Sequence, residues 1–224
     1  MQDIKYLFEP RSVAIIGATS NPRKLGYVVV HNILTSGYKG RVYPVNPKGG
    51  EILGIRALKS LAEAGEGVDL AVIVIPANLV FEAVKDCADN HVKFTAIITS
   101  GFSELGNAAE EHRIVRYASE HNMRVVGPNI IGIFSSAASL NATFGPSGMQ
   151  NGSMALLSQS GALAVAIVGK TIVENVGLSS IVSLGNKADI DETDLLPYLA
   201  TSNQNKVIMM YMEGVTNGGS WLQN

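Results

Sequence analysis

The sequence predicts an α/β fold built on parallel sheets, and three observations lead to this prediction. Short apolar runs rich in β-branched residues alternate with amphipathic stretches of helical length, which is the pattern of βαβ units. The apolar runs are nearly continuous, as in strands that are covered on both faces. Small polar turns follow the ends of the runs, where a parallel sheet binds its ligands.

The first half is expected to form a Rossmann-like domain over residues 1–134. Strands are expected at 12–16, 42–45, 70–75, 94–99 and 124–126, and helices at 26–36, 78–90 and 108–121. Residues 135–151, which are rich in Ser, Ala, Gly and Asn, are expected to be a connector.

The second half repeats the βαβ pattern over residues 152–224. Strands are expected at 154–157, 179–183 and 206–212, and helices at 161–174 and 192–200. Three strands make about half of a doubly wound domain, so this part is predicted to be an incomplete second domain. A three-stranded appendage to a single sheet is the alternative.

Composition and charge exclude several classes of protein. Hydrophobic residues make up 46% of the chain and the formal charge is −2, which argues against nucleic acid or an anionic membrane as partner. No apolar run approaches the roughly 18 residues that span a bilayer, and no signal peptide is expected, because residues 1–10 lack an apolar core segment. A cytoplasmic protein without a metal site is expected, since Cys87 is the single cysteine and the four histidines lack ligand spacing.

The turn after the first predicted strand is the strongest candidate for a nucleotide site. Gly17 lets backbone N–H groups approach a pyrophosphate at the start of the next helix. The spacing is not G-x-G-x-x-G, but two cations in the turn can also contact phosphate. A purely structural turn is the alternative. The candidate residues are Gly17, Ala18, Thr19, Ser20, Arg23, Lys24, Leu25 and Gly26.

The end of the second predicted strand indicates which nucleotide is favoured. An NAD site has an acidic residue there for the ribose hydroxyls, whereas this chain has Asn46 and Lys48. A lysine attracts a phosphorylated ribose, which favours coenzyme A or NADP. A solvated surface lysine is the alternative interpretation of Lys48.

Further candidates follow the third and fourth predicted strands. Pro76 fixes a turn that is suited to packing against an adenine or a pantetheine arm. Gly101, between Ser100 and Phe102, permits close approach of the backbone. Glu104 either accepts a hydrogen bond from the ligand or caps the next helix.

Two polar features of the second half are candidate catalytic sites. Ser158, Ser160 and Gly161 lie in a turn between a strand and a helix, which is either an N-cap or an anion site. The turn is not a nucleophile elbow, because Ser158 stands where that motif has glycine. Glu213 ends the last predicted strand, where a carboxylate can orient a histidine.

Taken in order, these blocks resemble the α subunit, or α-like part, of the ADP-forming acyl-CoA synthetases of the succinyl-CoA synthetase superfamily. The set covers nearly the whole chain and is more specific than any single block. The matching blocks are Leu7-Phe8-Glu9-Pro10-Arg11-Ser12-Val13-Ala14, the turn 17–26, Val45-Asn46-Pro47-Lys48, Gly101-Phe102-Ser103-Glu104, Gly127-Pro128-Asn129, Ser158-Gln159-Ser160-Gly161-Ala162, Ser183-Leu184-Gly185-Asn186-Lys187-Ala188-Asp189 and Tyr211-Met212-Glu213-Gly214.

The resemblance implies a CoA-binding Rossmann-like domain followed by a flavodoxin-like ligase domain. The implied reaction is acyl-CoA + ADP + phosphate ⇌ organic acid + CoA + ATP, through an acyl phosphate and a phosphohistidine, and the implied organic acid is acetate or a similar acid. The 17–26 turn, Lys48 and Asn129 would contact CoA. The 158–161 turn would receive the phosphoryl group, and Glu213 would steady the phosphohistidine.

Two departures from the family bear on these expectations. Ile130 stands where the family usually has cysteine, which we expect to be a packing change. The family's phosphorylated histidine lies beyond the Tyr-x-Glu-Gly strand, and the sequence ends at Asn224 before it. We therefore expect a fragment or a short paralogue that is inactive alone. Its expected partner is an ATP-grasp domain or β subunit that holds Mg-ATP or ADP, in an oligomer acting on a small organic acid and phosphate.

Two other functions remain open. One is a non-catalytic CoA-binding or regulatory module, which includes the related part of protein acetyltransferases. The other is an NADP-dependent oxidoreductase, although the sequence shows no Tyr–Lys or histidine dyad for hydride transfer. No residue in the sequence distinguishes acetate from a longer or an aromatic acid as the source of the acyl group.

Overall fold

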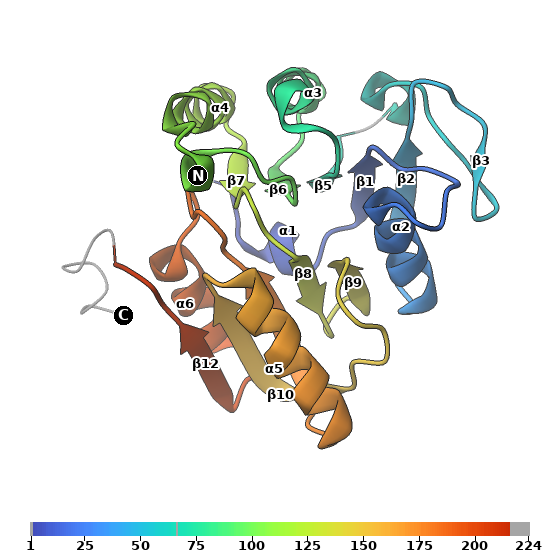
Figure 1. Ribbon diagram of the computed structural model, residues 1–224. Helices are drawn as coiled ribbons and strands as arrows, with labels where there is room; N and C mark the ends of the chain where they lie inside the picture. The colour runs from blue at the N-terminus through green and yellow to red at the C-terminus, as the bar shows by residue number, and fades with distance from the viewer. Residues whose placement is uncertain (1, 66, 216–224) are drawn as a thin grey trace.

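Five parallel strands form the first sheet of the computed structural model, which describes residues 2–65 and 67–215 (Figure 1). Their order is β2-β1-β5-β6-β7, so the chain leaves β1 toward one edge of the sheet and returns at β5 toward the other. The strands are β1 (Ser12–Ile16), β2 (Arg41–Val45), β5 (Leu70–Ile73), β6 (Phe94–Ile97) and β7 (Arg124–Val126). All five expected strands of this half are present, and β1, β5 and β6 are buried throughout.

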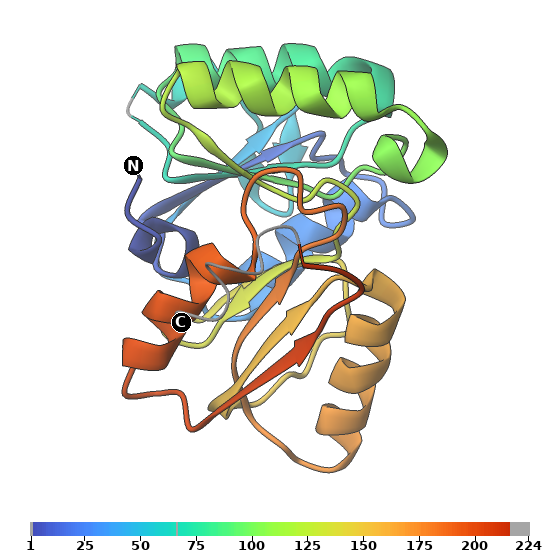
Figure 2. The same ribbon diagram turned by 90° about the vertical axis from the view of Figure 1, so that its left-hand side faces the viewer.

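Helices cover both faces of this sheet (Figures 1 and 2). Helix α2 (Leu25–Thr35) lies on one face, while α3 (Ala77–Asp89) and α4 (Ala108–Glu120) lie on the other. The remaining elements are short: α1 (Lys5–Phe8), the hairpin of β3 (Glu51–Ile52) and β4 (Ile55–Arg56), and the 3-10 helices η1 (Leu61–Ala64) and η2 (Ser103–Leu105).

A second sheet follows in the order β12-β10-β11-β8-β9. Its strands β10 (Asn151–Ser158), β11 (Leu178–Ser183) and β12 (Val207–Tyr211) are parallel to one another. Helix α5 (Gly161–Val173) and helix α6 (Glu192–Thr201) connect them. The two halves therefore have separate sheets, rather than one sheet with a three-stranded appendage.

The segment 135–151 differs from the expected connector. Strand β8 (Gly132–Ser135) and strand β9 (Leu140–Thr143) form an antiparallel pair, and β8 also pairs antiparallel with β11. Each strand has only four residues, the shortest run in which an alternation of apolar and polar residues can be detected, so the sequence pattern hides these strands. Tertiary burial stabilises them instead, because every residue of both strands is buried.

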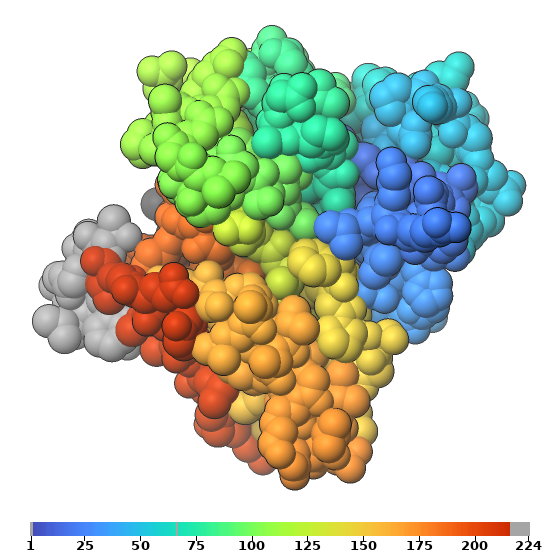
Figure 3. All heavy atoms as spheres, viewed as in Figure 1, coloured from blue at the N-terminus to red at the C-terminus, as the bar shows by residue number. Residues whose placement is uncertain are grey.

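The two sheets share one hydrophobic core. A single buried cluster contains Val13 and Val29 of the first half together with Leu157 and Leu195 of the second. The Asn32 side chain of α2 donates a hydrogen bond to the Thr143 carbonyl at the end of β9 (2.9 Å). The halves are consequently packed as one body (Figure 3).

An ion-pair network also joins the two halves. The Arg124 guanidinium on β7 contacts Asp189 (Nε to both oxygens, 3.0 Å) and Asp194 (3.1 Å). Asp189 also accepts the N–H of Val125 at 2.7 Å. The side chains of Arg124, Asp189 and Asp194 are only 16–22% exposed. The two ion pairs of Arg124 are therefore held more rigidly than a salt bridge on the surface.

Candidate functional site: a cofactor cleft and an adjoining cavity

A cavity of 1110 Å³ lies at the carboxyl ends of β1 and β5, where the strand order reverses. We call it the first cavity. Open α/β sheets bind ligands at this switch point. The expected cofactor residues that line it are Gly17, Ala18, Thr19, Ser20, Arg23, Lys24, Leu25, Gly26, Asn46, Lys48, Pro76 and Ser100.

The backbone of the 17–26 turn is fixed by short-range contacts. Gly17 has φ +95°, a left-handed conformation that side chains disfavour, and a Cβ there would lie 2.4 Å from the Val74 carbonyl oxygen. Asn46 donates from its amide to the Ala18 carbonyl (2.8 Å) and accepts the N–H of Lys48 (2.9 Å). One asparagine thus ties the turn to the end of β2.

Helix α2 begins at the wall of the first cavity without a side-chain cap. Its N-cap residue is Lys24, which has extended backbone and makes no capping hydrogen bond. The first N–H groups of a helix need partners from elsewhere, and the helix dipole favours an anion at this end. The geometry is therefore that of a phosphate-accepting turn.

The charges around the first cavity are mainly positive. Arg23, Lys24 and Lys48 line it, together with one carboxylate, Glu51. Within the described part of the chain, none of the three cations forms an ion pair. They are consequently available to an anionic ligand.

Three of the expected residues after β6 do not line the first cavity. Phe102 is completely buried in the core of the first half, and a Cβ on Gly101 would lie 3.0 Å from the Cβ of Ala77. Glu104 accepts the N–H groups of Gly101 and Phe102 in the turn after β6, and it caps neither η2 nor α4. Burial alone would raise the pKa of Glu104, but hydrogen bonds from Gly101 and from Asn186 lower it.

A second cavity of 540 Å³ lies between the two halves, and Leu25, Ile98 and Ser100 line both cavities. We call it the second cavity. The expected residues Asn129, Ser160, Gly161 and Glu213 meet here, from the turn after β7, the start of α5 and the end of β12. The two cavities therefore adjoin at the start of α2.

The serines of the 158–161 turn have structural partners. Ser158 is completely buried, and its hydroxyl donates to the Ser160 carbonyl at 2.8 Å. The Ser160 hydroxyl caps α5 by accepting the N–H of Leu163 at 3.3 Å. Ser160 also lines the second cavity, whereas Ser158 does not.

A buried polar network that the sequence prediction missed supports the end of β12. Gln159 accepts the N–H groups of Glu213 (2.8 Å) and Gly214 (3.1 Å), and it donates to Glu192. Lys187 pairs with Glu192 at 3.1 Å and donates to the Gly214 carbonyl at 2.7 Å. The network holds the backbone that carries Glu213 at the rim of the second cavity.

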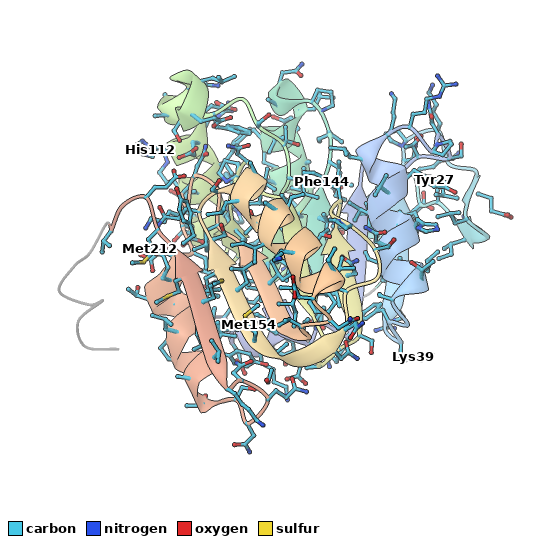
Figure 4. All side chains as sticks on the ribbon, turned by 60° about the horizontal axis from the view of Figure 1, so that its bottom comes forward. Tyr27, Lys39, His112, Phe144, Met154 and Met212 are labelled. Atoms are coloured by element: carbon cyan, nitrogen blue, oxygen red, sulfur yellow. The ribbon has the colours of Figure 1, made fainter. Side chains whose placement is uncertain are left out.

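The histidines contribute to neither cavity. His31, His91, His112 and His121 are all exposed, and none of them lines the first or the second cavity; Figure 4 labels His112, which lies on α4. No group of three or more His, Cys, Asp or Glu suited to a metal ion occurs among residues 2–65 and 67–215. In the same residues, no helix has the length and apolarity to cross a bilayer.

The fold and the first cavity define a doubly wound α/β protein with a cationic turn at the switch point of its first sheet. Comparison with known families makes the class specific: the chain belongs to the CoA binding domain family, which matches residues 11–136. Residues 151–223 match the succinyl-CoA ligase like flavodoxin domain.

Relatives over nearly the whole chain are acyl-CoA ligases. The chain is 46% identical to the acetate–CoA ligase [ADP-forming] I subunit alpha of Pyrococcus furiosus over 98% of its length, and 38% identical to the 4-hydroxybutyrate–CoA ligase [ADP-forming] of Nitrosopumilus maritimus over 97%. It spans 49% and 32% of these two proteins.

A solved structure shares the fold. The dinucleotide forming acetyl-coenzyme A synthetase 1 of Ca. Korarchaeum cryptofilum, in complex with phosphate and ADP, superposes with a TM-score of 0.95 at 45% identity. The match covers 97% of this chain and 47% of that one. The Rossmann-like and flavodoxin-like assignment is thereby confirmed, and so is the similarity to ADP-forming acyl-CoA synthetases.

Proposed function

We propose that this chain binds coenzyme A in the first cavity, as the CoA-binding part of an ADP-forming acyl-CoA synthetase. The main support is that Arg23, Lys24 and Lys48 line one cavity at the switch point of the first sheet. The chain also belongs to the CoA binding domain family. The pyrophosphate lies on the 17–26 turn, and Lys48 contacts the ribose phosphate.

The proposal extends to the second cavity. The thiol end of CoA passes Leu25 and Ser100, which line both cavities, and reaches the start of α5. There Ser160 and Gly161 receive a phosphoryl group, and Glu213 steadies a phosphohistidine that another segment supplies. Gln159 supports this role, because it holds the backbone N–H of Glu213.

The complete reaction requires more than the described residues. We propose that an ATP-grasp domain or β subunit binds Mg-ATP or ADP and exchanges the phosphoryl group with this part, in the cytoplasm. The partial coverage of the relatives supports a larger enzyme, since the chain spans 49% of the Pyrococcus furiosus α subunit. The reaction is acyl-CoA + ADP + phosphate ⇌ organic acid + CoA + ATP.

Calorimetric titration tests the proposal with three ligands: CoA, dephospho-CoA and NADPH. CoA is expected to bind most tightly, and dephospho-CoA more weakly because it lacks the ribose phosphate. Equal affinity for CoA and dephospho-CoA would refute the role of Lys48, and binding of NADPH alone would refute the CoA site. A separate expectation is that the chain forms no phosphoenzyme with labelled ATP or acetyl phosphate.

A further inference from the structure

We infer that a third cavity, at the opposite end of α2 from the first, binds a small neutral molecule rich in hydroxyl groups, such as a monosaccharide or a cyclic polyol. The third cavity has a volume of 370 Å³. It lies between the two halves, where the C-terminal end of α2 meets β8, β9 and the start of β10 (Figure 1). The inference does not depend on the proposed CoA site.

The third cavity has no charged residue in its lining among the described residues. Its ten lining residues include three asparagines, three serines and one threonine, whereas Arg23, Lys24 and Lys48 line the first cavity. A charged ligand would lose its hydration in the third cavity without gaining an ion pair. Amides and hydroxyls donate and accept hydrogen bonds, as the hydroxyl groups of a polyol do. The lining is consequently suited to a neutral hydroxylated molecule and unsuited to a phosphate or a carboxylate.

Asn141 on β9 offers free hydrogen-bond donors to the third cavity. It is 5% exposed, and its Oδ1 accepts the N–H (3.3 Å) and the hydroxyl (2.8 Å) of Thr143. Its Nδ2 donates to no residue within 2–65 and 67–215. This atom is not sealed in the core either, because among the described residues only the Ser179 and Ser180 hydroxyls are buried without a partner. The Nδ2 group therefore faces the third cavity, which Asn141 lines.

Asn32 on α2 offers the complementary acceptor. It is 4% exposed, and its Nδ2 donates to the carbonyls of Thr143 (2.9 Å) and Gly145 (3.2 Å). Its Oδ1 accepts no hydrogen bond from the described residues, and this oxygen is likewise not sealed in the core. Because both asparagines are anchored on Thr143, a free donor and a free acceptor are held in place before a ligand binds. Neighbouring hydroxyl groups of one polyol can accept from Asn141 and donate to Asn32.

The third cavity also has an apolar wall. Phe134 on β8 is 4% exposed and belongs to a buried cluster of the second half, and Met149 packs against the same cluster. Both residues line the cavity. The C–H groups of a sugar or cyclitol ring gain by leaving water for such a wall, which water molecules in the cavity do not. The combination favours a hydroxylated carbon ring over ordered water.

The third cavity is separate from the proposed CoA site. Helix α2 runs from Leu25, which lines the first cavity, to Thr35, which lines the third, over about 15 Å. The two cavities share no lining residue. A polyol and CoA are therefore expected to bind at the same time.

The test is calorimetric titration of this chain with glucose, myo-inositol and glucuronate, each with and without saturating CoA. Glucose or myo-inositol is expected to bind with a Kd of about 1 mM, and CoA should leave this value unchanged. Glucuronate, a sugar of the same ring that carries a carboxylate, should bind about tenfold more weakly or less. Binding of neither neutral polyol would mean that the third cavity holds water only, and would overturn the inference. Equal binding of glucuronate would overturn the selection for neutral ligands, and competition by CoA would overturn the location, whether or not CoA itself binds as proposed.

A pair of threonines locates the binding. Thr35→Phe places a ring at the third cavity and is expected to weaken polyol binding by about tenfold or more. Thr201→Phe is the matched control, because Thr35 and Thr201 are both exposed and both end a helix, and each hydroxyl donates to the carbonyl four residues earlier. Thr201 does not line the third cavity. Equal polyol affinity in the two variants would overturn the assignment of the site.

Discussion

Gly26 faces Gly17 across the start of α2, and a Cβ on Gly26 would lie 2.1 Å from the carbonyl oxygen of Gly17. Both glycines line the first cavity. The strand end and the helix start can approach this closely because Gly26 has no side chain. The shape of the proposed phosphate turn therefore depends on a backbone contact between these two residues.

Gly26→Ala is expected to push α2 away from β1. The free energy of unfolding should fall by about 1–3 kcal/mol, as for an overpacked buried site. CoA affinity should fall by about tenfold or more, which corresponds to roughly 1.4 kcal/mol. Urea unfolding and calorimetry measure the two effects separately.

Gly169→Ala is the control for this substitution. Gly169 also lies within a helix, α5, and apart from its chain neighbours and the backbone of its own helix no atom lies within 4 Å of where its Cβ would be. Alanine there should raise stability by about 0.5–1 kcal/mol through helix propensity and leave CoA binding unchanged. If Gly26→Ala bound CoA as tightly as Gly169→Ala, the turn would not be the phosphate site.

Lys48→Gln is expected to reduce the preference for CoA over dephospho-CoA. An exposed ion pair with phosphate contributes about 1 kcal/mol, so the ratio of the two affinities should fall by about fivefold and more so at low salt. Lys39→Gln is the control, because Lys39 (Figure 4) precedes β2 whereas Lys48 follows it, at the opposite end of the strand. An unchanged ratio in Lys48→Gln would place the ribose phosphate elsewhere.

Local sequence signals were sufficient to predict the first cavity. Gly17, Asn46 and Lys48 lie at strand ends that follow clear apolar runs, and parallel strands bring such ends to one edge of a sheet. The hairpin of β3 and β4, which also borders the cavity, was missed because each strand has two residues and carries no periodic pattern.

Long-range partners could not be predicted in the same way. Asn186 contacts Glu104 across 82 positions, and Gln159 contacts Glu213 across 54. An amide side chain in a turn has the same local signature whether it faces solvent or a buried carboxylate. These contacts depend on how the two sheets pack, which propensity and periodicity do not encode.

Asp69→Asn is expected to lower the free energy of unfolding at neutral pH, and to lower it by less at acidic pH. Asp69 is 1% exposed and contacts Lys93 (2.6 Å) and Arg11 (3.2 Å). Burial alone would raise the pKa of Asp69, but the hydrogen bonds from Lys93 and Arg11 outweigh it and hold the pKa below its ordinary value of 3.8. A carboxylate with a lowered pKa stabilises the fold above its unfolded pKa, and this contribution is lost as pH falls through the folded value.

Urea unfolding at several pH values measures this contribution. At pH 7, Asp69→Asn should lower the free energy of unfolding by about 2 kcal/mol, since the site loses its negative charge and one of the two oxygens that accept from Lys93 and the Arg11 N–H. The difference in unfolding free energy between Asp69→Asn and the unsubstituted protein should become smaller below pH 3.8. Asp89→Asn, at the exposed end of α3, should show neither effect. A difference that stayed constant with pH would contradict a charge-based role.

Asn186→Ala is expected to loosen the turn after β6 although the substitution lies in the second half. The Asn186 amide donates to Glu104 and to Glu111, and the Glu104 carboxylate in turn accepts the N–H groups of Gly101 and Phe102. Loss of the amide leaves two carboxylates without this partner, so stability should fall by about 1–2 kcal/mol. Hydrogen exchange at the Gly101 and Phe102 amides should accelerate more than global unfolding explains. Asn205→Ala, which removes only a local bond to Leu199, should leave these amides unchanged, and faster exchange there in both variants would show that Asn186 does not couple the halves.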